Sequence, residues 1–152
     1  MSKMNEIEFE YCRQFLDKIK KHPLSVCYLK PVDPIKDQAT DYFKVISDPM
    51  DLGTISHKLD DHQYSSTEEF KYDVNLVWSN SMKYLKKKTI LLYQVAQHMK
   101  DKCDKLLQNI PKTKAEEWAI RMQAANKKLN KHLSLAIPQE SLVPRKPEYT
   151  IT

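Results

Sequence analysis

Apolar residues recur at steps of three and four in several stretches of the chain. This spacing places the apolar side chains on one face of a helix, where neighbouring helices can bury them. In residues 4–21 the apolar positions include Phe9, Cys12, Leu16 and Ile19. Similar stretches follow Asp51, Ser66 and Thr89. The pattern therefore predicts an all-α bundle with four main helical segments in residues 1–110.

Residues that commonly start helices stand in front of the last three stretches. Asp51 and Thr89 each carry a side-chain oxygen that can accept a hydrogen bond from a free backbone N–H. The run Ser66-Thr67-Glu68-Glu69 has the form of a capping box, in which a Glu follows a hydroxyl residue after three positions. The short lysine-rich turn 85–88 then predicts that the last two helices of the bundle are antiparallel neighbours.

Prolines mark a long interruption between the first two helical stretches. Four of the eight prolines fall within residues 23–49. Proline lacks a backbone N–H and interrupts helices, so we expect one long irregular loop here. Loops of this length in compact domains usually carry function. The loop is therefore the first place to look for binding residues.

The C-terminal part of the chain has a different pattern. Residues 111–137 form a further helical stretch, and two interpretations of it remain open. The helix packs back on the bundle, or it forms a coiled-coil seam with a protein partner through residues 113–136. Residues 138–152 contain three prolines and predict an extended or disordered tail. The apolar positions of the helical stretch lie near heptad spacing: Ala115, Trp118, Met122, Ala125, Leu129 and Leu133.

Composition excludes several classes of function. A single glycine cannot build the glycine-rich loops that hold nucleotide phosphates. The five histidines and three cysteines are scattered, without the paired spacing of a metal site. No combination of nucleophile, base and oxyanion donor is recognisable, and no apolar run has the length of a membrane span. We therefore expect a binding module that is not an enzyme and needs no metal or cofactor.

Positive charge is concentrated at the C-terminal end of the sequence. Residues 1–110 hold 17 Lys and Arg against 16 Asp and Glu, a balance of +1. Residues 111–152 hold 8 against 4, a balance of +4. A weak contact with DNA is one interpretation of this excess, together with the lysines of the 85–88 turn.

The segment from Tyr28 to Leu85 resembles a bromodomain. The resemblance covers about residues 5–110 and implies a left-handed four-helix bundle with a long first loop. It also implies recognition of acetyl-lysine in the tails of histones or other chromatin proteins, and a nuclear location. The motifs that carry it are Pro31-Val32-Asp33, Asp41-Tyr42-Phe43, Pro49-Met50-Asp51-Leu52-Gly53-Thr54-Ile55, Lys58-Leu59, Asp73-Val74 and Asn80 with Tyr84.

The resemblance also assigns pocket residues. Acetylation removes the lysine charge and leaves an amide on an apolar stem, which an apolar, aromatic-lined pocket can accept. In the family an Asn side chain donates a hydrogen bond to the acetyl oxygen, and a loop Tyr holds a bridging water. Tyr42 matches that Tyr, and Asn80 matches an Asn for which we expect a structural role. The other matching pocket positions are Tyr28, Val32, Tyr84 and a gatekeeper at Leu91 or Leu92.

The sequence departs from the family at the anchoring position. Leu85 stands where the Asn is expected, and a leucine cannot donate a hydrogen bond. A shifted alignment gap places Lys86 there instead. We expect Asp37 and the lysines Lys86, Lys87 and Lys88 at the pocket rim, where the lysines would repel a basic histone tail. Two functions follow: an acetyl-lysine reader with an atypical pocket, or a degenerate bromodomain that serves as a protein-interaction or DNA-contacting module in a chromatin complex.

Overall fold

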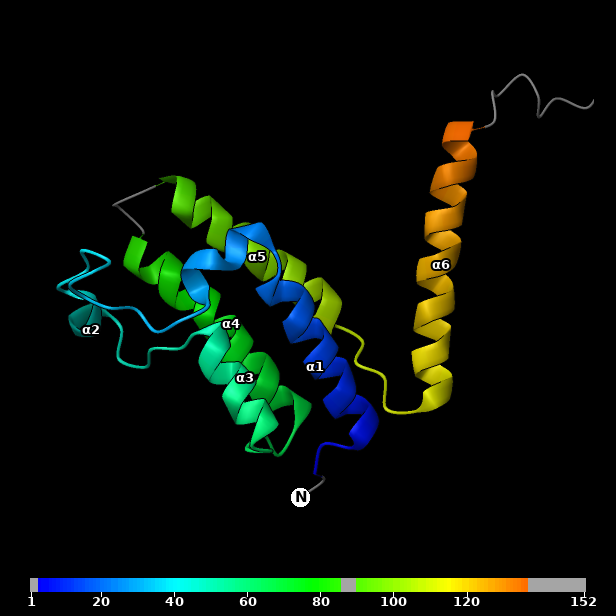
Figure 1. The fold of residues 1–152 in the computed structure, drawn as a ribbon, viewed down its shortest axis with the longest axis horizontal. Helices are drawn as coiled ribbons and strands as arrows, with labels where there is room; N and C mark the ends of the chain where they lie inside the picture. Colours follow the sequence, from blue (N-terminus) through cyan, green and yellow to red (C-terminus); the bar gives the residue numbers. More distant parts are fainter. Residues whose placement is uncertain (1–2, 86–89, 137–152) are drawn as a thin grey trace, which may run out of the picture. The chain divides into compact units, whose positions relative to one another are not determined.

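The computed structural model describes residues 3–85 and 90–136, and every regular element in these ranges is a helix. The all-α prediction is therefore confirmed. The chain divides into two compact units, Met1–Lys112 and Thr113–Thr152. Figure 1 shows the elements in chain order: α1 Glu6–Lys20, the 3-10 helix η1 Pro23–Tyr28, α2 Tyr42–Val45, α3 Leu52–Asp60, α4 Thr67–Leu85, α5 Ile90–Leu107 and α6 Lys114–Ala136.

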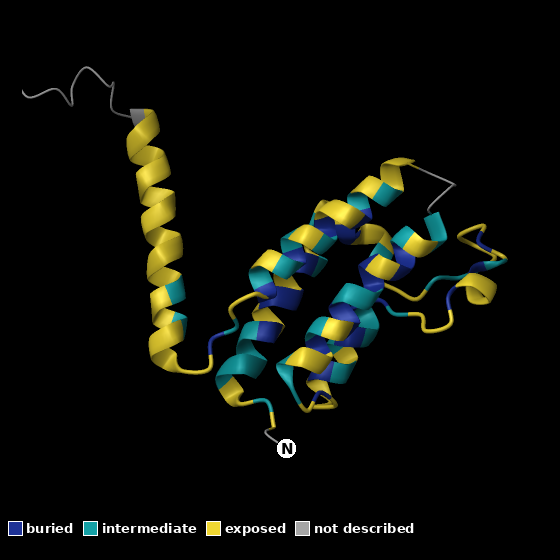
Figure 2. Ribbon diagram, turned by 180° about the vertical axis from the view of Figure 1, so that it is seen from behind, coloured by how far each residue is buried: buried dark blue, intermediate teal, exposed yellow. Residues whose placement is uncertain are grey.

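The first unit is a bundle in which α1, α3, α4 and α5 run alongside one another (Figures 1 and 2). Their apolar faces meet in one core, as the periodicity predicts. Each large side chain buried there contributes about 1.5–3 kcal/mol relative to an exposed one. The core includes Cys12, Leu16, Ile19, Leu52, Ile55, Phe70, Trp78 and Met99, whose exposure is at most 2%.

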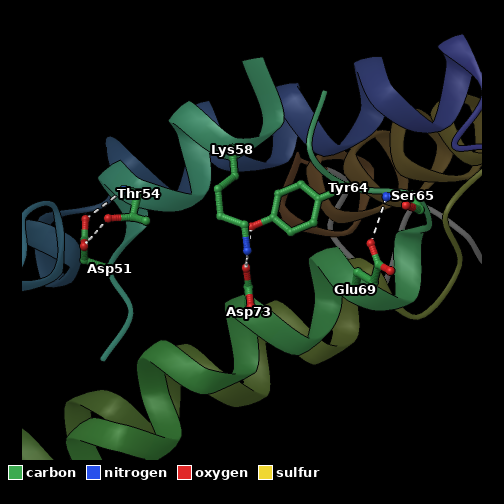
Figure 3. A network of polar contacts seen from close by, with 7 residues as sticks. All are labelled: Asp51, Thr54, Lys58, Tyr64, Ser65, Glu69 and Asp73. Carbon is green, nitrogen blue, oxygen red and sulfur yellow. Dashed lines mark hydrogen bonds and ion pairs between the residues drawn. The ribbon is translucent and has the colours of Figure 1, made fainter. Parts of the chain in front are cut away.

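Side-chain caps fix where the bundle helices begin. The Asp51 carboxylate accepts a hydrogen bond from the Thr54 backbone N–H at 2.9 Å, so the predicted start of α3 is confirmed. The Ser66 hydroxyl accepts from the Glu69 N–H at 3.3 Å, as predicted for α4. The Glu69 carboxylate, however, accepts from the Ser65 N–H at 2.8 Å, one residue earlier than in a capping box (Figure 3). The expected cap at Thr89 lies outside the described residues.

The loop between α1 and α3 is less irregular than predicted. It contains η1, where Pro23 occupies the first turn and the His22 ring nitrogen accepts from the Leu24 N–H at 3.2 Å. It also contains α2, a single turn closed by the Ile46 N–H on the Tyr42 carbonyl at 2.8 Å. Helices this short have no apolar periodicity, so the sequence pattern could not reveal them.

A buried polar network ties α3 to α4 (Figure 3). Asp73 on α4 accepts hydrogen bonds from the Lys58 ammonium and from the Tyr64 hydroxyl, the latter at 2.7 Å. The Lys58 nitrogen also lies 4.7 Å from the centroid of the Tyr64 ring. Burial and the adjacent Asp73 carboxylate raise the pKa of Tyr64, so its hydroxyl stays a donor. The network thus holds the end of α3 against α4.

The single glycine permits close contact between the loop and α3. A Cβ atom at Gly53 would lie 2.5 Å from the Leu29 carbonyl oxygen, well inside van der Waals contact. We expect Gly53→Ala to lower the free energy of unfolding by about 1–3 kcal/mol, because backbone must move and the gain in helix propensity is smaller. Urea denaturation followed by circular dichroism measures this change. The exposed His57→Ala on the same helix is the control, and equal stability of the two variants would contradict the packing argument.

The second unit contains α6, which lies within the stretch predicted as helical. Arg121 donates to Glu117 one turn earlier at 2.7 Å. The packing of this helix and its expected protein partner stay predictions, and the predicted tail at 138–152 lies outside the described residues. In the part of the chain that is described, no helix is both long and apolar enough to cross a membrane. Four apolar residues of α6 are between 42% and 66% exposed: Trp118, Met122, Leu129 and Leu133.

Candidate functional site

A cavity of about 320 Å³ lies at one end of the bundle. The loop with η1 and α2 covers this end, near the end of α4 and the start of α5 (Figure 1). All six residues that the sequence assigned to the pocket line this one cavity, together with Asp37 from the predicted rim. Of the two leucines considered as gatekeeper, Leu92 is the one that lines it. The six are Tyr28, Val32, Tyr42, Tyr84, Leu85 and Leu92.

Two other cavities of similar volume lie elsewhere on the bundle. One of about 400 Å³ is lined by Phe9, Leu59 and Tyr64, and one of about 340 Å³ by Lys71 and Asp104 among others. Volume alone therefore does not select a site. The cavity at the loop differs because three tyrosines and several apolar side chains converge on it.

One wall of the cavity is a pair of aromatic rings. The centroids of Tyr42 and Tyr84 are 5.1 Å apart, and the rings meet edge to face. The Tyr84 hydroxyl donates to the Asp41 carboxylate at 2.7 Å, which ties the end of α4 to the loop. Tyr42 is buried beside Ala39 and Ile46 in a small second core. The wall is therefore held from both the loop and α4.

Tyr28 and Ser81 form a polar contact among the lining residues of the same cavity. The Tyr28 and Ser81 hydroxyl oxygens are 2.9 Å apart, and both residues line the cavity. The Tyr28 ring packs edge to face on Trp78, with centroids 4.8 Å apart. Burial raises the pKa of Tyr28, so the phenol stays protonated at neutral pH.

Asn80 has the structural role expected from the sequence. Its side-chain nitrogen donates to the Asp48 carbonyl oxygen at 2.7 Å, and the residue is buried. Two further hydrogen bonds start from the same part of α4. Ser81 bonds to Tyr28 of η1, and Tyr84 bonds to Asp41, which precedes α2, whereas Asp48 follows α2. The loop over the cavity is thus positioned by one helix.

The rim carries charge of both signs. Asp37 and Lys30 both line the cavity, and the Asp37 carboxylate accepts from the Asp33 N–H at 2.8 Å. The predicted rim residues Lys86, Lys87 and Lys88 lie outside the described residues. Leu85 lines the cavity with an apolar side chain that cannot donate a hydrogen bond, and its match to the family's Asn stays a prediction. In the described ranges, no cluster of His, Cys, Asp and Glu has the arrangement of a metal site.

Sequence reasoning missed Ser81 and the support that Trp78 gives to Tyr28. A signal for Ser81 was present, because it lies one helical turn before Leu85 and so shares its face of α4. The hydroxyl of a buried tyrosine such as Tyr28 also needs a hydrogen-bond partner. The identity of that partner depended on the fold, since Tyr28 and Ser81 are 53 positions apart.

The three cysteines differ in burial, so the rates at which their thiols react test the packing of the bundle. Burial raises the pKa of the Cys12 and Cys103 thiols to about 12, whereas Cys27 is exposed at the cavity. Since the thiolate is the nucleophile, we expect a chromogenic disulfide reagent at pH 8 to modify one thiol rapidly in the folded protein and all three after denaturation. Peptide mapping should locate the fast modification at Cys27. Comparable rates for two or three thiols in the folded state would contradict the burial.

Comparison with known proteins identifies the class to which this bundle belongs. The sequence profile of the bromodomain family matches residues 12–97, and the chain belongs to that family. The match includes the loop, α3, α4 and the start of α5, which are the elements that build the cavity.

Relatives of the chain include a transcription factor and a subunit of the SWR1 complex. It is 36% identical over 126 residues to transcription factor GTE1 of Arabidopsis thaliana, which covers 82% of this chain and 32% of that protein. It is 41% identical over 75 residues to the SWR1 complex bromodomain subunit bdf1 of Schizosaccharomyces pombe, covering 49% and 13%. An ankyrin repeat, bromo and BTB domain-containing protein of Dictyostelium discoideum is 41% identical over 81 residues, covering 53% and 10%. The chain thus spans a third or less of the length of these relatives.

Proposed function

We propose that this bromodomain recognises an acetylated lysine side chain in the tail of a histone or another chromatin protein, through a pocket without the family's asparagine. The observation that carries the proposal is the convergence of all six expected pocket residues on one cavity. The proposed site consists of Tyr28, Val32, Tyr42, Tyr84, Leu85 and Leu92, with Asp37 at its rim.

The lining of the cavity suits the chemistry of acetyl-lysine. Val32, Leu92 and the rings of Tyr42 and Tyr84 offer apolar contact for the methylene stem and the acetyl methyl group. The amide needs hydrogen-bonding partners, because leaving it unpaired in the pocket costs roughly 1–3 kcal/mol. An unmodified lysine would instead lose the hydration of a full charge, which costs more. The pocket should therefore favour the acetylated form.

Tyr42 supplies one polar group for the amide. Among the described residues, no protein group hydrogen-bonds to its hydroxyl, which leaves the hydroxyl available to a ligand or a water. Burial raises the pKa of Tyr42, so the hydroxyl remains a neutral donor at physiological pH. This is the role that the resemblance implies for Tyr42 as holder of a bridging water.

The names of the relatives support a setting in chromatin. One is called a transcription factor and another a subunit of the SWR1 complex. We infer a nuclear location and a role in transcription regulation for this chain, with a protein tail as the partner. The function is that of a non-enzymatic recognition module.

Calorimetric titration of paired histone-tail peptides, acetylated and unmodified, tests the proposal. We expect the acetylated member of at least one pair to bind about tenfold more tightly or better, and Tyr42→Phe to remove most of that difference. Tyr72→Phe is the matched control, since Tyr72 is 63% exposed and does not line the cavity. Equal affinity for the acetylated and unmodified members of every pair would contradict acetyl-lysine recognition and favour the degenerate bromodomain that acts as an interaction module.

A further inference from the structure

With Leu85 in place of the family's asparagine, as the proposed function has it, the acetyl oxygen would lack its usual donor. We propose that the Tyr28–Ser81 hydroxyl pair supplies this hydrogen bond, so that the pocket recognises an acyl-lysine amide through hydroxyl groups from η1 and α4. The inference rests on the proposed function and names the donor within the same site. It concerns Tyr28 and Ser81 as specificity-determining residues.

The structure places both residues of the pair at the cavity. Tyr28 and Ser81 line it, and their oxygens are 2.9 Å apart. Ser81 lies four residues before Leu85 on α4, hence on the same helical face and about 6 Å deeper along the axis. A donor is therefore present one turn below the position at which the family places its asparagine.

A count of hydrogens shows that the pair has a donor to spare. Two hydroxyls carry two hydrogens, and the bond between them uses one. In residues 3–85 and 90–136, no third protein group hydrogen-bonds to either hydroxyl. Whichever oxygen donates within the pair, the other keeps a hydrogen that can point to a ligand oxygen. Because burial raises the pKa of Tyr28, that hydrogen is retained at neutral pH.

Lys30 also lines the cavity, but it carries a charge, and three further polar side chains are engaged or are acceptors. The Tyr84 hydroxyl donates to Asp41. The Asp51 carboxylate is an acceptor and is occupied by the Thr54 N–H and hydroxyl. The Asp37 carboxylate is also an acceptor. Apart from Tyr42, with its separate role, the hydroxyl pair is thus the neutral hydroxyl donor that these contacts leave for a buried amide oxygen.

Support for Tyr28 fixes the direction of its hydroxyl. Its ring packs edge to face on Trp78, which is 0% exposed. Ser81 is itself 9% exposed and sits on a regular turn of α4. A donor held by a packed ring and a helix loses little conformational freedom when the ligand binds.

The test compares wild type with Tyr28→Phe, Ser81→Ala and the double variant, titrated with one acetylated histone-tail peptide and its unmodified form. We expect each single variant to bind the acetylated peptide about threefold more weakly and the double variant about tenfold more weakly. Binding of the unmodified peptide should not change. Ser79→Ala is the matched control, because Ser79 is an exposed serine of α4 that does not line the cavity.

A rescue distinguishes a lost donor from a damaged pocket. Leu85→Asn places an amide donor one turn above the pair, so adding it to the double variant should restore acetyl-peptide binding. Thermal denaturation checks that each variant is folded, and if the double variant does not fold, the two single variants decide. Unchanged acetyl-peptide affinity in both single variants and in any folded double variant would overturn the hydroxyl-pair inference. Failure of the wild type to prefer the acetylated peptide would instead overturn the proposed function.

Discussion

Asp73→Ala is expected to lower the free energy of unfolding by about 2–4 kcal/mol, because it leaves the buried Tyr64 hydroxyl and the half-buried Lys58 ammonium without their hydrogen-bond acceptor. Asp73 is 6% exposed and accepts hydrogen bonds from both Lys58 and Tyr64. Its removal strands the Lys58 ammonium between α3 and α4 and leaves the Tyr64 hydroxyl unpaired. Urea denaturation monitored by circular dichroism measures the change.

A surface ion pair supplies the control for this substitution. Arg13 and Glu10 on α1 lie 3.0 Å apart, and both side chains are well exposed. Exposed pairs of this kind contribute little, since water solvates the separated charges. We expect Glu10→Ala to leave the denaturation midpoint nearly unchanged. A similar midpoint for Asp73→Ala would contradict the view that the buried network holds α3 to α4.

The second large effect is expected for Trp78→Ala, which should lower the free energy of unfolding by about 3–5 kcal/mol. Trp78 is completely buried in the bundle core, and its loss leaves a cavity that the surrounding helices cannot fill fully. It also removes the ring on which Tyr28 packs. Binding of an acetylated peptide should therefore weaken under conditions in which the variant is still folded.

An exposed aromatic residue on the same helix is the control, because its removal deletes a ring of comparable size without opening a cavity in the core. Tyr72 lies on α4 and is 63% exposed, so Tyr72→Ala should change stability by no more than about 0.5 kcal/mol. Denaturation and peptide titration of both variants provide the comparison. If Trp78→Ala kept wild-type stability and affinity, the link between core and pocket would be wrong.

Local sequence signals were sufficient to predict most of the bundle. Helical periodicity and the caps at Asp51 and Ser66 depend on neighbours within one or two turns, which a sequence shows directly. The capping box formed by Asn5 and Glu8 at the start of α1 was just as local and was overlooked. The single turns η1 and α2 could not be predicted, because they are shorter than the period that reveals a helix.

For the candidate site, the sequence predicted the main lining residues but not the contacts between them. Its main positions followed from the spacing of the bromodomain motifs, and the structure brings the six expected residues together. The contact of Tyr28 with Ser81 was not visible, because residues far apart in the chain meet only after the helices pack. The same holds for Gly53, whose importance comes from the approach of the Leu29 carbonyl.

The most direct test of the account is chemical-shift mapping of the labelled protein during titration with a short peptide that carries one acetyl-lysine. We predict that backbone amide shifts change at the cavity residues, Tyr28, Val32, Tyr42 and Ser81 among them, and that the unmodified peptide leaves these signals in place. Equal changes with both peptides, or changes confined to residues away from the cavity, would contradict acetyl-lysine recognition at this site.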